Sequence, residues 1–134
     1  MLRLRNSVLV VPQSLSTFAT FCGVVGLCGL EAVAAASQRQ TTALIERLTR
    51  IKGVKLAFDG YRFHEAVLQL NAKVSDVLDA LAERNIVGGL DLSKHYPELG
   101  NALLVCATET RTDADLDAYA SALAEVLTAM ERKS

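Results

Sequence analysis

Apolar positions along the chain recur with two different periods, and each period predicts a type of secondary structure. From Leu30 to Ile51 they return every three or four residues, as on one face of a helix. The stretch from Thr112 to Met130 has the same spacing, with Thr112 as the cap and aspartates in the first turns. A shorter helix is expected from Ser75, as N-cap, to Asn85. The stripe expected to be buried in the first helix is Leu30, Val33, Ala34, Leu44, Leu48 and Ile51.

Strand patterns lie between these helices. "VKLAF" (54–58) alternates, and "FHEAVLQL" (63–70) follows after an Asp59-Gly60 turn, so the two are expected to form an antiparallel hairpin. "ALLVCAT" (102–108) is a continuous apolar run, typical of a central strand, and "IVGGL" (86–90) indicates a short strand or a turn. In the second strand the inward set is either Phe63, Glu65, Val67 and Gln69 or the more apolar His64, Ala66, Leu68 and Leu70. The second set is favoured and would place His64 near the buried face.

The predicted order is helix, strand, strand, helix, strand, helix. This order is typical of an α+β fold in which helices pack on one face of a small, mostly antiparallel sheet. The length of 134 residues suits one domain with a real core.

Composition narrows the class of protein. Hydrophobic residues make up 51% of the chain and the mean hydropathy is +0.26, so we expect surplus apolar surface to pack against another structure. No apolar run is long enough to span a membrane, and the net charge of −1 without basic blocks excludes a nucleic-acid role. Cys22, Cys28 and Cys106 are expected to be reduced, buried thiols of a cytoplasmic protein, and no ligand spacing for a metal is present.

The first residues have a superficial signal-peptide pattern. Arginines precede an apolar run in "MLRLRNSVLVV", and "AVA" (32–34) resembles a cleavage site. Pro12 and the polar residues after it interrupt the run early, so secretion is not expected.

Two polar or glycine-rich stretches are candidates for a functional site. Gly88-Gly89 lacks the spaced glycines and the lysine of a phosphate loop, so a turn that needs unusual dihedrals or close backbone approach is expected. The cluster from Thr108 to Thr112, with Glu109 and Arg111, follows an apolar strand, where ligand contacts are common, although caps and turns use the same residue types.

No complete catalytic site is predicted. His64 and Glu65 point to opposite faces of one strand, and His95 lies in a loop beside Pro97. Cys106 is expected inside a strand, and no lysine has the apolar setting that Schiff-base chemistry requires. We therefore assign no catalytic, cofactor-binding or metal-binding residue, and treat Gly88, Gly89, Thr108, Glu109 and Arg111 as structural or possibly cleft-facing.

Several stretches together resemble one enzyme family. "GVKLAFDG", "FHEAVLQL" and the run "VLDALAERNIVGGLDLSKHYPELGNALLVCATETRTDADLDAYASAL" resemble the C-terminal end of glycine dehydrogenase (decarboxylating) subunit 1, the P-protein of the glycine cleavage system. The densest part runs from Ile86 to Thr112, and the resemblance extends from about Gly23 to Leu127. Residues 1–22 match poorly, so 23–134 is expected to be a C-terminal small domain and 1–22 a separate segment.

The resemblance implies a fold and a role. The fold would be the small domain of a fold-type-I pyridoxal-phosphate enzyme, and the Schiff-base lysine of the parent enzyme would lie on subunit 2. The holoenzyme decarboxylates glycine and passes the aminomethyl group to a lipoyl carrier protein. The resemblance therefore implies two partners, glycine dehydrogenase subunit 2 and the lipoyl carrier protein. Because the family subunit is several times longer, this chain is expected to be structural, cytoplasmic and inactive alone, binding no cofactor itself. The alternative is a stand-alone interaction or regulatory module that homodimerises.

Overall fold

The computed structural model describes residues 15–133 and has the predicted order of elements. In chain order these are α1 (Leu15–Leu48), β1 (Val54–Leu56), β2 (Glu65–Leu70), α2 (Val74–Ala82), β3 (Leu90–Asp91), the short 3-10 helix η2 (Pro97–Leu99), β4 (Ala102–Cys106) and α3 (Asp113–Glu131). The predicted α+β class is confirmed. Of the stretch 86–90, for which a short strand or a turn was expected, only Leu90 belongs to a strand, β3.

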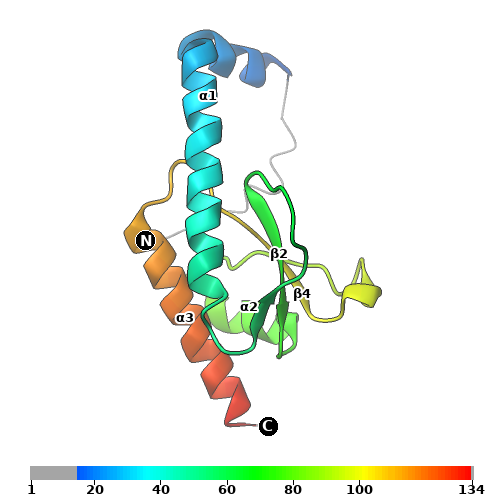
Figure 1. The fold of residues 1–134 in the computed structure, drawn as a ribbon. Coiled ribbons are helices and arrows are strands. Elements are labelled where there is room, and N and C mark those ends of the chain that lie inside the picture. The colour runs from blue at the N-terminus through cyan, green and yellow to red at the C-terminus, as the bar shows by residue number, and fades with distance from the viewer. Residues whose placement is uncertain (1–14, 134) are drawn as a thin grey trace.

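One four-stranded sheet, in the order β1-β2-β4-β3, forms the centre of the fold. Each neighbouring pair is antiparallel: Val54 lies opposite Leu70, Leu68 opposite Leu103, and Leu90 opposite Leu104. The helices lie on one side of this sheet, and the segment that contains η2 lies on the other (Figure 1). The predicted hairpin of the first two strands is confirmed.

Alternation along β2 decides which side chains enter the core. Ala66, Leu68 and Leu70 are buried, whereas Glu65 and Gln69 are exposed. The more apolar of the two predicted sets therefore faces the helices. His64, which precedes the strand, is half-buried, and its Nδ1 atom lies inside the protein.

The core lies between the sheet and the helices. At its centre Leu68 and Leu103 of the sheet are fully buried with Leu81 of α2 and Leu123 of α3. Burying a side chain of this size contributes about 1.5–3 kcal/mol to the free energy of unfolding. The same cluster includes Leu44 and Leu48, Val74 and Val77, Leu116, Val126 and Leu127.

Helix α1 differs from the prediction at both ends. It begins at Leu15 and ends at Leu48, with a kink at Gly26, whose φ of 70° and ψ of 177° are not helical. No side chain from Cys22 to Ala36 is buried, and Ser37 is the first that is. The predicted stripe is therefore wrong in its first part: Leu30, Val33 and Ala34 are only half-buried, because this part of α1 projects beyond the sheet (Figure 1). None of the described helices combines the length and apolarity needed to cross a membrane.

The start of α2 also differs from the prediction. Lys73, not Ser75, is the N-cap, and it makes no side-chain capping bond. Ser75 instead donates to Asp76 Oδ1 at 3.0 Å. The helix starts earlier because Val74 is fully buried and belongs to the apolar face of α2. Asn85, three residues after the last helical residue Ala82, takes the left-handed conformation with φ of 60°.

The cysteines correct a further expectation. Cys28 is exposed, and Cys22 and Cys106 are half-buried, so none is a buried core thiol. The first two lie on the projecting part of α1, and Cys106 lies on the β4 side that faces away from the helices. None of the three forms a disulfide.

Candidate functional site

The strand-to-helix corner, residues 108–112 between β4 and α3, is built around the start of α3. Thr112 is the N-cap, as predicted: its Oγ1 accepts the amide of Asp115 at 3.2 Å, and Asp115 Oδ2 accepts the amide of Thr112 at 2.9 Å. This reciprocal pair satisfies donors that the first turn of a helix otherwise leaves without partners. The amide of Thr112 also lowers the pKa of Asp115, because it stabilises the carboxylate.

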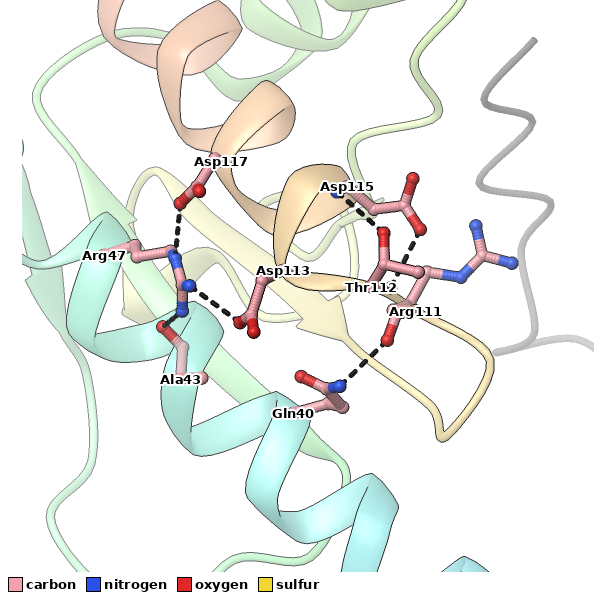
Figure 2. Close-up of polar contacts among 8 residues, drawn as sticks. All are labelled: Gln40, Ala43, Arg47, Arg111, Thr112, Asp113, Asp115 and Asp117. Carbon is pink, nitrogen blue, oxygen red and sulfur yellow. Dashed lines mark hydrogen bonds and ion pairs between the residues drawn. The ribbon is translucent and has the colours of Figure 1, made fainter.

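Side chains of α1 hold the backbone of this corner. Gln40 Nε2 donates to the carbonyl of Arg111 at 2.9 Å (Figure 2), and Thr41 Oγ1 donates to the carbonyl of Ala107 at 3.0 Å. Ser37 Oγ accepts the amide of Glu109 at 3.2 Å and donates to its carboxylate at 3.1 Å. Since Ser37 and Thr41 are buried, these contacts fix the corner from the inside.

Arg47 joins α1 to α3 at the protein surface. Its Nη2 lies 2.8 Å from Asp113 Oδ1 and its Nε lies 2.6 Å from Asp117 Oδ1, while Nη1 donates to the carbonyl of Ala43 at 3.1 Å (Figure 2). The hydrogen bond with Asp117 is the main reason that the pKa of Arg47 is raised. Both carboxylates are well exposed, so the pair fixes the direction of the contact more than it stabilises the fold.

The charges at the corner argue against an anionic ligand. A helix N-terminus favours anions, but here Asp113, Asp115 and Asp117 already supply negative charge, and the capping pair occupies the amides of Thr112 and Asp115. The Arg111 guanidinium points away from α1 (Figure 2), and its Nη2 lies 3.3 Å from Thr110 Oγ1. The arrangement suits a joint between two elements. That Thr108, Glu109 or Arg111 faces a substrate cleft stays a prediction.

The glycine pair is packed tightly between α2, β4 and α3. Gly89 has a φ of 143°, and a Cβ atom there would overlap the carbonyl oxygen of Leu104. A Cβ on Gly88 would lie 2.5 Å from Leu81 Cδ1. A side chain at either position would therefore require its neighbours to move, and at Gly89 the neighbour is backbone.

Tyr119 of α3 connects the glycine pair to the region of the corner. Its hydroxyl donates to the carbonyl of Gly88 at 2.6 Å, and burial raises the pKa of Tyr119 because the phenolate would be desolvated. The register of β3 and β4 places the glycines beside the end of β4 that leads into the corner. Tyr119 falls on the apolar stripe of the helix predicted from Thr112 to Met130, and nothing local in the sequence indicates a hydrogen-bond partner so distant along the chain.

The other reactive residues do not assemble into a site. The expectation that His64 and Glu65 point to opposite faces is wrong: His64 precedes β2, and its Nε2 lies 3.7 Å from Glu65 Oε1. His95 is exposed in its loop. All five lysines are exposed, so none has the desolvated setting of a Schiff-base nucleophile. Within residues 15–133 no three His, Cys, Asp or Glu side chains are grouped as metal ligands would be.

Four residues that organise the corner were missed in the sequence. Gln40 and Arg47 lie outside the predicted apolar stripe, yet both are half-buried, Gln40 against the carbonyl of Arg111 in the corner and Arg47 against α3. Ser37 and Thr41 stand four positions apart within the apolar stripe of α1. A pair of small polar residues at that spacing is the one local signal that could have indicated buried hydrogen bonds.

Comparison with known proteins gives a consistent result. No protein-family model matches the chain. A probable glycine dehydrogenase (decarboxylating) subunit 1 from Methylococcus capsulatus is 54% identical over 107 residues, which is 80% of this chain and 24% of that protein. Proteins of the same name from Nitrosospira multiformis and Thiobacillus denitrificans are 49% and 50% identical over 80% of the chain and 24% of their own lengths.

A solved structure supports the same relationship. The crystal structure of glycine decarboxylase (P-protein) of the glycine cleavage system, in inhibitor-bound form, superposes with a TM-score of 0.77 and is 33% identical. The match covers 81% of this chain and 24% of that one. The resemblance inferred from the sequence is confirmed, and the chain spans about a quarter of the length of the proteins it matches.

Proposed function

We propose that this chain, homologous over four fifths of its length to glycine dehydrogenase (decarboxylating) subunit 1, is a structural part of a glycine-decarboxylating assembly and is inactive on its own. The observation that carries the proposal is the pairing of 54% identity with coverage of only 24% of the relative. A chain so similar over so small a share of an enzyme corresponds to one of its modules. Residues 23–134 would be that module, residues 1–22 a separate segment, and the cytoplasm its location.

The cofactor of the parent enzyme, pyridoxal phosphate, does not fit this chain. Such a cofactor needs a lysine in a desolvated pocket and donors for its phosphate. Here every lysine is exposed, and the start of α3 is acidic. We therefore place the cofactor on a partner, subunit 2, and assign the lipoyl carrier protein as the second partner.

The proposal is tested by a pull-down and an activity assay with the full chain. Tagged chain, exposed to lysate from its own cells, is expected to recover subunit 2 or the lipoyl carrier protein, identified by mass. An unrelated tagged domain of similar size serves as the control. Purified chain supplied with pyridoxal phosphate is expected to release no carbon dioxide from glycine. Recovery of neither partner, or release of carbon dioxide by the chain alone, would overturn the proposal.

A further inference from the structure

Most aromatic side chains after residue 22 are exposed, although aromatic residues usually lie in the core. Tyr119 is 3% exposed, whereas Phe58 is 57%, Tyr96 51% and Phe63 43% exposed. Tyr61, next to these in sequence, is exposed as well. Aromatic residues supply the largest apolar area when buried, and they are enriched where proteins meet each other.

Two of these side chains, Phe58 and Tyr96, lie beside the sheet face that no α-helix covers. We call this side the open face. Val67 of β2 and Leu104 of β4 lie opposite each other in register, and both are half-buried there. Ala66, Leu68 and Leu103 point the other way, into the core. A groove of about 340 Å³ crosses the open face, lined by Phe58, Val67, Leu92, Tyr96, Glu98 and Leu99.

The groove is held in shape by the loop that carries η2. The amide of Tyr96 donates to the carbonyl of Leu92 at 2.8 Å, and the amide of Leu99 donates to the carbonyl of Tyr96 at 3.0 Å. Gln69 of β2 ties the loop to the sheet, since its Nε2 donates to the carbonyl of Leu99 at 3.3 Å. A groove that is already formed loses little conformational entropy when a partner fills it.

The lengths of the relatives indicate what covers this face. Relatives 54% and 49% identical to the chain carry about three quarters of their length outside the matched segment. That remainder has to meet this module somewhere. The open face offers a groove lined mainly by apolar and aromatic side chains, while the opposite face is already packed against three helices.

We propose that the open face, centred on Val67 and Tyr96, is the docking surface for the polypeptide that corresponds to the remaining three quarters of glycine dehydrogenase subunit 1. An apolar side chain of that polypeptide fills the groove beside Phe58. This inference rests on the proposed function and adds to it the surface and the class of partner. The helix side of the module stays exposed in the complex.

Binding is tested with the full chain and the Methylococcus capsulatus subunit 1 from which the matched segment has been removed. The wild-type chain is expected to form a one-to-one complex on size-exclusion chromatography. Val67→Asp and Tyr96→Asp are expected to weaken binding at least about 100-fold by titration calorimetry, because each places a carboxylate in a contact that excludes water. Ser121→Asp, which adds the same charge to an exposed position of α3, is the matched control and is expected to bind as wild type.

Each outcome separates this inference from the proposed function. Circular dichroism and a cooperative melt establish that the variants fold. If the wild type binds and both open-face variants bind equally well, the surface is wrong although the proposed function stands. If the wild type does not bind while the pull-down recovers subunit 2, the class of partner is wrong. If the chain alone is a dimer that Tyr96→Asp converts to a monomer, a second copy covers the face and the inference is overturned.

Discussion

The two faces of the sheet are made from the same strands but serve different ends. On the helix side Leu103 is fully buried; its neighbour Leu104, one position on, is half-buried on the open face. The helix side is closed by apolar packing and by buried hydrogen bonds from Thr41 and Tyr119. The open face holds a shallow groove and exposed aromatic rings. The difference indicates that folding depends mainly on one face, which leaves the other available for binding.

The largest effect is expected from a pair of neighbouring leucines. Leu103→Ala removes a fully buried side chain and is expected to lower the free energy of unfolding by about 2–5 kcal/mol. Leu104→Ala removes the same atoms from the open face and is expected to cost less than about half of that, because much of the side chain already meets water. Urea denaturation of both variants measures the difference. Equal losses would show that the two faces contribute equally to stability.

The next effect is expected where β3 approaches β4. Gly89→Ala is expected to lower the free energy of unfolding by about 1–3 kcal/mol, because φ of 143° is strained for alanine and the new Cβ would overlap the carbonyl of Leu104. Thermal melting followed by circular dichroism measures it. Gly23→Ala, which meets nothing within 4 Å, is the matched control and is expected to cause no loss. A tolerated Gly89→Ala would mean that this edge of the sheet can move.

A buried hydrogen bond on the helix side gives a smaller effect with a pH signature. Tyr119→Phe leaves the Gly88 carbonyl without its donor and is expected to cost about 1–2 kcal/mol near neutral pH. Burial raises the pKa of Tyr119 above the value of about 10 for an unfolded tyrosine. As the pH rises, the unfolded chain therefore loses this proton before the folded chain does. The stability from this residue is complete below about pH 10 and is lost as the pH rises further.

Urea unfolding of wild type and Tyr119→Phe at several pH values between 8 and 11 checks this sign. The gap between the two curves is expected to narrow above pH 10, because phenylalanine has no proton to release. Tyr61 and Tyr96 are present in both proteins, so their titration cancels. A gap that is constant with pH would show that Tyr119 is not buried as a neutral phenol.

The smallest effect is expected at the start of α3. Thr112→Ala removes the cap and is expected to lower the free energy of unfolding by about 1 kcal/mol. Thr128→Ala is the control, since that hydroxyl donates within its own helix and is exposed. Because α3 packs on the helix side of the sheet, Thr112→Ala is expected to leave binding at the open face unchanged. A large loss of binding would link the corner to the partner surface.

The elements of the fold were predictable because each has a local cause. The periods of apolar residues give the type of each element, and Thr112 with Asp115 gives the start of α3. Alternation in β2 correctly indicated that Ala66 and Leu68 face inward. Ser75 misled because a good capping residue stood next to Val74, and burial of that valine set the start of α2.

Contacts between distant residues were not predictable in the same way. A period shows which side of a helix is apolar, but it does not show whether a neighbour covers that side. Leu30 and Val33 are therefore only half-buried, although they continue the stripe of Leu44. Gln40 and Arg47 are polar residues of the kind that usually face solvent, yet Gln40 binds the carbonyl of Arg111 in the corner and Arg47 binds carboxylates of α3. The cleft-facing role of Glu109 and Arg111 stays a prediction.

Among the side chains described from Cys22 to the end of α1, burial begins only at Ser37, so the preceding part of the helix projects from this buried base. Residues 27–36 extend roughly 15 Å beyond the first buried position, Ser37, at about 1.5 Å per residue. If this helical segment tilts by about 10° at Ser37, its far end near residue 27 moves by roughly 3 Å. Ser37 and Thr41 are hydrogen-bonded to residues at the end of β4 and in the corner, and Arg47 is paired with α3. These bonds therefore set the direction of the projecting part of α1 and the position of Gly26.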